Sequence, residues 1–502
     1  MADQSSQSST SVALYALRAE GQNFKWVLYD THDLSAGAGG SRLLEEIPGE
    51  VEKVLISKIT QAGESFEKVQ SASSSAVYAC CCSEGKMKIV LRELREAFHK
   101  DGFAHLTVAV EAVKVQDGGC EPGKLAESVE QSHLHQLFAA IRYAQMTSPN
   151  AAVPAVANGV KLACDKDHLR PRGAKSGFKW SDSVYTRREQ GKDFRRELTV
   201  TQDGNNESVF TARTFEGLTS LNDPTDPRNL KLAVISIDGN GFGKLITDNC
   251  KNGARLQQFS GKMKGLQDAF EQSLLQDWYG RKGDKRYFVN AKVDDAFAMD
   301  GGGEGPNNRP DRLLRLQRLV TAGDDAIYLM PAWLAWEFLQ KFFGVNWTIT
   351  LTDPAASIPL TFRVGMVNCH HNAPIHRIRK LADELSNLAR NAAKDAPVKI
   401  DNPIAYEVLK SFDLVGPDLA KYREDRVQKK LLPYQLLLDG KKLKDQTLPD
   451  GTIQEGKLKQ LRELEEKWPA GMIKDLSVWK DQSDDAVNAF HLSQLGPYLQ
   501  KE

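Results

Sequence analysis

At 502 residues the chain is too long for one core, because single hydrophobic cores stop growing near roughly 250–300 residues, so we expect two or three domains. Hydrophobic residues make up 41% of the chain and charged residues 26%, which is typical of soluble globular proteins, and no run of about 18 apolar residues could span a bilayer. The 66 Lys and Arg residues balance 66 Asp and Glu residues, so no net positive field favours nucleic acid. A small binding module and a membrane-spanning protein are excluded, and any RNA or DNA binding must be local.

The N-terminus and the cysteines favour a cytoplasmic protein. Residues 1–11 have no basic segment followed by an apolar one, which predicts neither a secretory signal nor a transit peptide. Three of the seven cysteines, Cys80, Cys81 and Cys82, are consecutive, a spacing that suits neither disulfide pairing nor tetrahedral zinc, and we interpret them as small buried strand residues. Cys164 and His168 have metal-ligand spacing but no second pair nearby, which disfavours structural zinc.

Residues 1–150 predict a first α+β unit. A turn between two β-rich runs indicates a hairpin, and a glycine-rich turn at residues 37–40 precedes Ser41, which could cap a short helix. Periodicity predicts strands at 12–17, 24–29, 51–59, 76–82 and 105–113, and a longer helix at 86–99. The order strand, helix, strand, strand, helix, strand fits an α+β sandwich.

Two further segments have weaker strand patterns. In residues 151–230 basic and polar stretches predominate and prolines punctuate residues 223–227, so we interpret the segment as a linker with helical content. Residues 401–502 predict a mostly helical C-terminal domain, with one strand at 404–409 and a charged helix at 457–468.

Residues 231–400 predict a second α+β unit. The apolar, β-branched run 232–237 indicates a strand buried on both faces, and this strand ends at Asp238. Asp324 and Asp325 lie in a predicted hairpin. The other predicted elements are helices at 245–274, 332–343 and 375–394, strands at 326–330 and 360–368, and a glycine-rich loop at 299–309.

Asp238 and Asp324 suit a metal site if their strands are neighbours. Carboxylates close together oppose each other's ionisation unless a cation neutralises them. Magnesium commonly takes one or two carboxylates together with substrate phosphates, as in nucleotide polymerases and cyclases. Gly239, Gly241 and Gly243 leave room for a triphosphate to approach backbone amides before a predicted helix. Each feature alone also fits an ordinary turn.

Three segments, in order, resemble one family. It is the large signalling subunit of type III CRISPR effector complexes, related to the GGDEF nucleotide cyclases. Its palm strand and turn resemble residues 232–246, Leu-Ala-Val-Ile-Ser-Ile-Asp-Gly-Asn-Gly-Phe-Gly-Lys-Leu-Ile, and its GGDD hairpin resembles Thr-Ala-Gly-Asp-Asp at 321–325. Its next strand, linker and helix resemble residues 359–367, 370–375 and 381–385. Residues 39–44 and 75–82 are more faintly similar to its first, degenerate palm.

The resemblance implies an α+β fold with two ferredoxin-like palm domains, the second carrying the acidic site, and a helical C-terminal domain. It implies Asp238 and Asp324 as ligands of Mg²⁺ or Mn²⁺, with Asp325 as an outer-sphere or alternate ligand. It also implies nucleotide-binding residues, namely Gly239, Asn240, Gly241, Phe242, Gly243, Lys244, Arg390 and Lys394. The first palm would help to hold a nucleotide without supplying metal ligands. The family's N-terminal HD nuclease domain and its four-cysteine zinc element are not recognisable, so we expect no such nuclease activity.

Three positions depart from the family pattern. Ala322 replaces the first glycine of the GGDD motif, which matters if that residue needs positive φ. Asn240 stands where many relatives have a second acid. Ile246 stands where GGDEF cyclases use an asparagine toward guanine, which disfavours a diguanylate cyclase, and the CRISPR family implies adenine.

The leading hypothesis is an enzyme, a nucleotidyltransferase that makes a cyclic or linear oligonucleotide second messenger from nucleoside triphosphates, with ATP as the expected substrate, in antiviral defence. The alternative is a non-catalytic palm-domain scaffold or sensor subunit of an RNA-guided CRISPR-type complex, which Ala322 and Asn240 favour slightly. A template-directed polymerase is a weaker third reading, because no thumb or fingers domain is evident. The implied partners are nucleoside triphosphates, RNA and CRISPR-type protein subunits, with a homo-oligomer left open.

Overall fold

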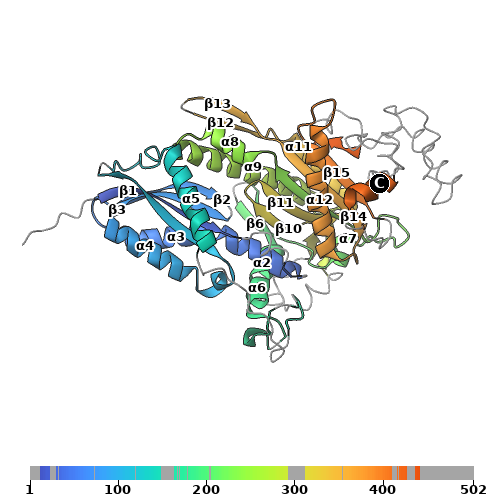
Figure 1. The fold of residues 1–502 in the computed structure, drawn as a ribbon. Helices are drawn as coiled ribbons and strands as arrows, with labels where there is room; N and C mark the ends of the chain where they lie inside the picture. Colours follow the sequence, from blue (N-terminus) through green and yellow to red (C-terminus); the bar gives the residue numbers. More distant parts are fainter. Residues whose placement is uncertain are drawn as a thin grey trace, which may run out of the picture.

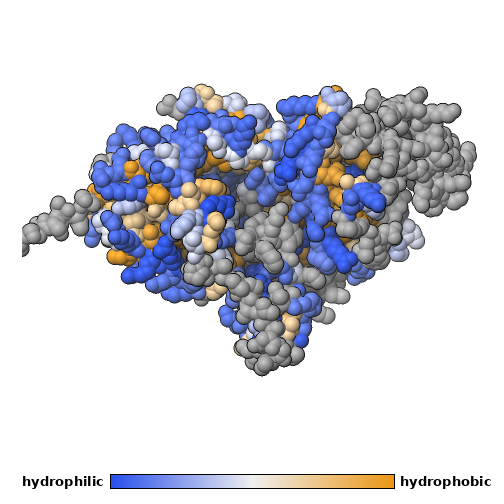
Figure 2. All heavy atoms as spheres, viewed as in Figure 1, coloured by the Kyte–Doolittle hydropathy of each residue, from blue (hydrophilic) through white to orange (hydrophobic). Residues whose placement is uncertain are grey.

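Two units of mixed helix and sheet lie side by side in Figure 1. The computed structural model describes residues 12–22, 30–31, 33–72, 74–118, 120–147, 163–166, 168, 170–177, 179–202, 205–291, 311–352, 354–409, 415, 418–426 and 436–440. Within these ranges no helix is both long enough and apolar enough to cross a membrane. The predicted elements at 24–29, 299–309 and 457–468 lie outside the described residues. Figure 2 shows that the face drawn in Figure 1 is mainly hydrophilic.

The first unit is a four-stranded antiparallel sheet in the order β2-β3-β1-β4. The strands are β1 (Val12–Gly21), β2 (Ser65–Ala72), β3 (Ser75–Ser83) and β4 (Val108–Asp117). The helices are α2 (Leu34–Glu45), α3 (Ile47–Lys58), α4 (Glu84–Ala97) and α5 (Gln131–Thr147). α3 and α4 bury apolar residues against one face of the sheet, and α5 packs on β4 and β1 at the other.

Two local predictions for this unit are wrong. Residues 51–59 lie mostly in α3 rather than in a strand, because Pro48 favours the first turn of a helix and the buried residues Val51 and Leu55 recur at helical spacing. Residues 37–40 lie inside α2 rather than in a turn. This helix begins at Leu34, where the side chain of Asp33 accepts a hydrogen bond of 3.0 Å from the Ala36 N–H.

The glycines of α2 allow a close crossing with α6 (Asp182–Arg196). A Cβ at Gly39 would lie 1.7 Å from the carbonyl oxygen of Arg187, and a Cβ at Gly191 would lie 1.7 Å from the carbonyl oxygen of Ser35. The two backbones can approach this closely only where neither helix carries a side chain. The glycine-rich segment therefore serves helix packing.

The second unit is a six-stranded sheet in the order β10-β11-β7-β14-β15-β16. The strands are β7 (Lys231–Gly239), β10 (Gln317–Ala322), β11 (Asp325–Pro331), β14 (Phe362–His370), β15 (Pro403–Val408) and β16 (Leu438–Asp439). The helices are α8 (Phe242–Asn249), α9 (Gly253–Gly280), α11 (Ala332–Gly344) and α12 (Ile375–Lys394). The neighbours of β7, which are β11 and β14, both run antiparallel to it.

Further described elements flank the two units. They are the hairpins β5 (Glu197–Gln202) with β6 (Asn205–Phe210), β8 (Phe288–Asn290) with β9 (Arg312–Leu314), and β12 (Thr348–Leu351) with β13 (Ala356–Pro359), and the helices α7 (Phe215–Thr219) and α13 (Leu419–Arg426). β15 pairs in parallel with β14, so the second sheet extends past residue 400, where the sequence predicts a boundary.

Both sheets contain the same strand order. In each, the first strand of the unit (β1 or β7) lies between the second strand of a hairpin (β3 or β11) and the strand with which the chain returns to the sheet after the next helix (β4 or β14). In the second unit the β12–β13 hairpin lies between that helix, α11, and β14. The ends also match in register, since Gly21 pairs with Val108 and Gly239 pairs with Phe362. The chain therefore contains two copies of one topological unit.

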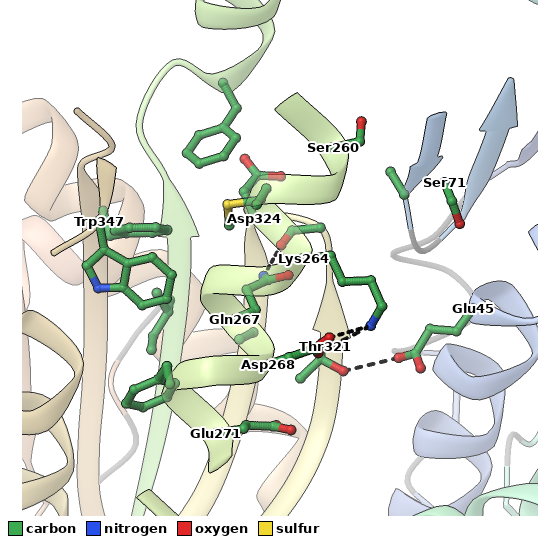
Figure 3. A pocket seen from close by; sticks show the side chains of 18 of the residues that line it. Glu45, Ser71, Ser260, Lys264, Gln267, Asp268, Glu271, Thr321, Asp324 and Trp347 are labelled. Atoms are coloured by element: carbon green, nitrogen blue, oxygen red, sulfur yellow. Dashed lines mark hydrogen bonds and ion pairs between the residues drawn. The ribbon is translucent and has the colours of Figure 1, made fainter. Parts of the chain in front are cut away.

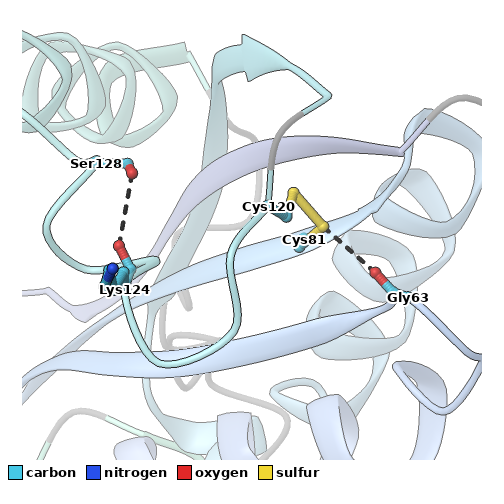
Figure 4. The surroundings of a disulfide bond; sticks show 5 residues. All are labelled: Gly63, Cys81, Cys120, Lys124 and Ser128. Carbon is cyan, nitrogen blue, oxygen red and sulfur yellow. Dashed lines mark hydrogen bonds between the residues drawn. A yellow bond between two sulfur atoms is a disulfide. The ribbon is translucent and has the colours of Figure 1, made fainter.

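The interpretation of the three consecutive cysteines is only partly right. All three are buried in β3, as predicted, but Cys81 forms a disulfide with Cys120, which follows β4 (Figure 4). Successive strand residues point to opposite faces, so Cys81 faces away from Cys80 and Cys82. Its partner is 39 residues away in sequence, which spacing within the run cannot indicate.

Candidate functional site

Asp238 stands next to last in β7, the strand between β11 and β14. Most residues of this strand are apolar and are buried on both faces of the sheet, whereas the side chain of Asp238 is 30% exposed. The strand thus carries a carboxylate from the core of the unit to its edge.

Asp324 lies in the turn between β10 and β11. The turn needs glycine at Gly323, whose φ is 65°, whereas Ala322 is the last residue of β10 and pairs with Asp325. Alanine at the first motif position is therefore compatible with the hairpin. A Cβ added to Gly239 would lie 2.7 Å from the Cβ of Asp324, so the turn is in contact with the end of β7.

The acids of the site repel one another. Burial raises the pKa of Asp324 to about 6, and Asp238 adds to the rise. Burial also raises the pKa of Asp325 to about 8, with further contributions from Asp238, Asp324 and Asp383. Asp325 is therefore close enough to these acids for their charges to act on it.

Arg363 is a site residue that sequence reasoning missed. It pairs with Asp238 in the antiparallel register of β14 and β7, its Nη2 forms an ion pair with Asp238, and its Nη1 donates to the Gly239 carbonyl at 3.4 Å. Asp383 of α12 was also missed, and it accepts a hydrogen bond of 2.7 Å from Ser236 Oγ. Both contacts depend on cross-strand and helix-to-sheet registers that no local pattern reveals.

A cavity of about 570 Å³ lies between the two units. Its first-unit wall includes Arg42 and Glu45 of α2 and Gln70 and Ser71 of β2. The opposite wall comes from the second unit, from α8, α9 and the β10–β11 hairpin with further residues of β7, α11 and β14, and it includes Asp324 (Figure 3). Much of that wall is aromatic, with Phe242, Phe259, Phe270, Tyr328, Trp347 and Phe362. Such a cavity offers an apolar surface for a planar ring and polar groups for a charged remainder.

Side chains of α9 organise this wall. Gln267 Nε2 donates to the carbonyl oxygen of Gly323, so the helix holds the turn that carries Asp324 (Figure 3). Lys264 and Asp268 form an ion pair of 3.1 Å one turn apart. The same helix also contacts β2, since Gln257 Nε2 donates to the Lys68 carbonyl at 2.7 Å. α9 therefore joins both units around the cavity.

The predicted nucleotide-binding residues have different positions. Phe242 and Gly243, in the first turn of α8, line the cavity, and Gly239 lies against Asp324. Gly241 precedes the helix with a φ of 67°, a left-handed backbone conformation that favours glycine. The side chain of Asn240 donates to the Asp401 carbonyl at 3.1 Å instead of facing the cavity.

The three predicted cationic residues, Lys244, Arg390 and Lys394, are exposed and do not line the cavity. Arg390 and Lys394 lie in the last turns of α12. This helix follows β14 and runs back along it, with Ala382 and Ser386 against Gly365. Both residues are thus at the end of the sheet that carries Asp238.

The carboxylates fit a magnesium ion that arrives with a triphosphate. Among the described residues no group of three or more His, Cys, Asp or Glu is arranged to hold a metal ion. Asp238 and Asp324 offer oxygen ligands. A divalent cation between them would neutralise their negative charges and so relieve their mutual repulsion. Magnesium often completes its coordination with phosphate oxygens and water, so two carboxylates suffice.

The first sheet has half of the corresponding site. Glu20, next to last in β1, occupies the register position that Asp238 has in β7, and it pairs with Arg18 at 2.8 Å. Ser75 begins β3 as Asp325 begins β11, so the first hairpin has a serine at the position of that acid.

Together these features define two copies of an α+β unit around one cavity, with a pair of carboxylates on the second copy alone. No protein-family model and no curated protein matches the sequence. Similar solved structures include Csm1 in T. onnurineus (TM-score 0.47, 16% identity, 98% of this chain and 65% of that one). Others are Csm1-Csm4 cassettes in complex with one ATP (0.46, 14%, 97% and 65%) and with cA4 (0.42, 13%, 97% and 68%).

Csm1 is the large subunit of type III CRISPR complexes, so these structural neighbours belong to the family that the palm motifs resemble. The chain spans about 65% of the length of Csm1.

Replacing Asp325 with Asn is expected to stabilise the metal-free protein increasingly as pH rises. The folded wild type keeps a proton on Asp325 up to about pH 8, whereas the unfolded chain releases it near 3.8, so wild-type stability falls as pH rises through this window. The variant lacks this loss, so its stability advantage should grow by up to about 1.4 kcal/mol per pH unit, or about 4 kcal/mol between pH 5 and pH 8. Thermal unfolding in EDTA at pH 5 and pH 8 measures the effect. Asp311→Asn, at an exposed position, is the control, and an Asp325→Asn difference that does not grow with pH would contradict the expectation.

Proposed function

We propose that the protein is a divalent-metal-dependent nucleotidyltransferase that joins nucleoside triphosphates into a cyclic or linear oligonucleotide. One observation carries the proposal. Asp324 projects from a hairpin turn into the cavity between the units while its turn touches the end of β7, where Asp238 stands. Paired carboxylates beside a cavity with aromatic and polar walls suit a nucleotide bound through a metal ion.

The reaction is attack of a 3′ hydroxyl on an α-phosphate, which forms the new O–P bond, releases pyrophosphate and frees the hydroxyl proton. Asp238 and Asp324 would hold Mg²⁺ or Mn²⁺, with Asp325 as the alternate ligand; when bound, the ion neutralises phosphate charge. Phe242 and Gly243 place the N-terminus of α8 at the cavity, where backbone N–H groups favour an anion. Arg363 must give up part of its pairing with Asp238 when a cation binds, because both compete for one carboxylate.

The finer assignments rest on the motif resemblance. We interpret the repeated strand order as two ferredoxin-like palm domains, of which the first helps to hold a nucleotide and the second carries the acids. ATP as the substrate, RNA and CRISPR-type subunits as partners, and a role in antiviral defence follow from the same resemblance. The exposed Arg390 and Lys394 would contact triphosphate oxygens that extend past the end of the sheet.

A non-catalytic scaffold or nucleotide sensor is the second candidate. The observation that favours it is the ion pair between Arg363 and Asp238, which already neutralises one of the two acids. A sensor of this kind would bind a triphosphate and leave it intact.

The test incubates the purified protein with Mg²⁺ and each nucleoside triphosphate in turn and identifies products by mass spectrometry. The enzyme hypothesis expects pyrophosphate and a 3′-linked oligonucleotide. Binding by calorimetry without any new product would favour the sensor, and neither binding nor product would contradict both.

Gly239→Ala is expected to lower kcat/KM by about 10- to 100-fold. The new methyl would lie 2.4 Å from the ring of Phe242 and 2.7 Å from the Cβ of Asp324, so the helix start or the turn must shift. Steady-state kinetics measure the loss. Gly265→Ala in α9, where a Cβ meets nothing within 4 Å, is the matched control. Equal activity of the two variants would show that the turn tolerates displacement.

A further inference from the structure

α2 belongs to the first unit in sequence but packs in the cores of both. Its Leu43 and Leu44 lie in the core of the first sheet, whereas Leu34 and Ala38 lie in a core of the second unit with Val320 of β10. A movement of either unit relative to the other must therefore displace this helix.

Glu45, the last residue of α2, occupies an unfavourable place for a carboxylate. It lies at the negative end of the helix dipole and lines the cavity between the units. Burial raises its pKa to about 6, Arg318 and Arg42 oppose the rise, and Glu271 adds to it. An acid kept at such a position needs a reason beyond packing.

The contacts of Glu45 supply that reason. Its Oε1 accepts a hydrogen bond of 3.2 Å from Thr321 Oγ1 (Figure 3). The same oxygen accepts one of 3.5 Å from Ser41 Oγ. Thr321 is in β10, three residues before Asp324, and it pairs with Ala326 of β11. A carboxylate of the first unit therefore binds the strand that leads into the acidic turn.

β10 has special need of such a contact because it is the edge strand of the second sheet. An edge strand has a ladder on one side only, so its position depends on contacts from outside the sheet. α9 holds the turn itself through Gln267, and α2 packs against β10 and supplies Glu45. One helix of each unit, α9 and α2, thus helps to hold the turn in place.

We propose that Glu45 is a positioning residue that, through Thr321, holds the Gly323–Asp324 turn in the geometry required for nucleotidyl transfer. The proposal rests on the proposed function and makes the first unit, which lacks an acidic pair, a necessary part of the active centre. Glu45 acts on the turn and not on the substrate. Its loss is therefore expected to change kcat more than KM.

The test compares Glu45→Ala, Thr321→Val and the double variant, with Glu93→Ala as the control. Glu93 is a first-unit carboxylate that pairs with Lys58 at 3.3 Å away from the cavity. Each single variant should lower kcat about tenfold with KM changed less than about twofold, and the double variant should be no worse than either single one, because both remove one contact. Glu45→Gln and Thr321→Ser, which keep an acceptor and a donor, should restore most of kcat. Additive losses, or unchanged kcat in properly folded variants, would overturn the proposal.

Hydrogen exchange of residues 317–326 separates this inference from the proposed function. Exchange should be faster in Glu45→Ala than in the wild type and unchanged in Glu93→Ala. That result in a protein without nucleotidyl transfer would refute the enzyme hypothesis alone. Unchanged exchange in Glu45→Ala would overturn the positioning role whether or not the wild type is active.

Discussion

Asp238→Asn and Asp324→Asn are each expected to lower product formation by about 10³-fold or more. Each substitution removes one negative charge from a pair that must hold a divalent cation against a triphosphate, while the amide keeps nearly the same shape. The measurement is turnover of nucleoside triphosphates with Mg²⁺, followed by mass spectrometry of the products. Asp248→Asn is the control, because Asp248 is exposed on α8 outside the cavity.

The two variants should differ in stability. Asp324→Asn relieves the repulsion that raises the pKa of Asp324 and should be at least as stable as the wild type. Asp238→Asn leaves Arg363, a buried residue, without its charged partner and should lose about 1–3 kcal/mol. Thermal unfolding measures both changes. Wild-type turnover in either variant would show that the carboxylate pair does not hold the metal, and activity would then lie elsewhere in the chain.

The parts of the site that the sequence predicts are those with local signals. An apolar β-branched run marks β7 and places Asp238 at its end, and the Gly-Asp pair marks the turn with Asp324. The apolar stripe of residues 375–394 marks α12. Each signal depends on residues within one element, so each survives without knowledge of the fold.

The parts that could not be predicted depend on contacts between distant segments. Arg363 lies opposite Asp238 only because β14 pairs with β7 in one register, and Glu45 reaches Thr321 across 276 residues of sequence. A one-residue change of register would reverse the faces of the strand and remove such a contact. The disulfide partner of Cys81 is hidden for the same reason.

A glycine-rich segment can indicate either a turn or a close helix–helix contact, and the sequence alone does not distinguish the two. A glycine-rich segment before Ser41 resembles a turn because glycine is unfavourable in helices. In α2 that cost is accepted because α6 crosses at a distance that excludes side chains.

Gly39→Ala and Gly191→Ala are each expected to lower the free energy of unfolding by about 3 kcal/mol. In either variant the new methyl would lie 1.7 Å from a backbone carbonyl oxygen of the facing helix, and a backbone cannot move aside as a flexible side chain can. Urea unfolding measures the loss. The control is Gly261→Ala in α9, where a Cβ meets nothing within 4 Å, and which should be neutral or stabilising by up to about 1 kcal/mol because alanine favours helix.

The same two substitutions should also loosen the turn that carries Asp324. If α6 pushes α2 aside, Glu45 moves with its helix and the hydrogen bond to Thr321 lengthens, so residues 317–326 should exchange amide hydrogens faster than in the wild type. Gly261→Ala should leave that exchange unchanged. Alanine variants at Gly39 and Gly191 that were as stable as Gly261→Ala would contradict the close crossing. Lower stability with unchanged exchange in the hairpin would show that α2 and β10 move independently, since a helix that held the turn could not be displaced without releasing it.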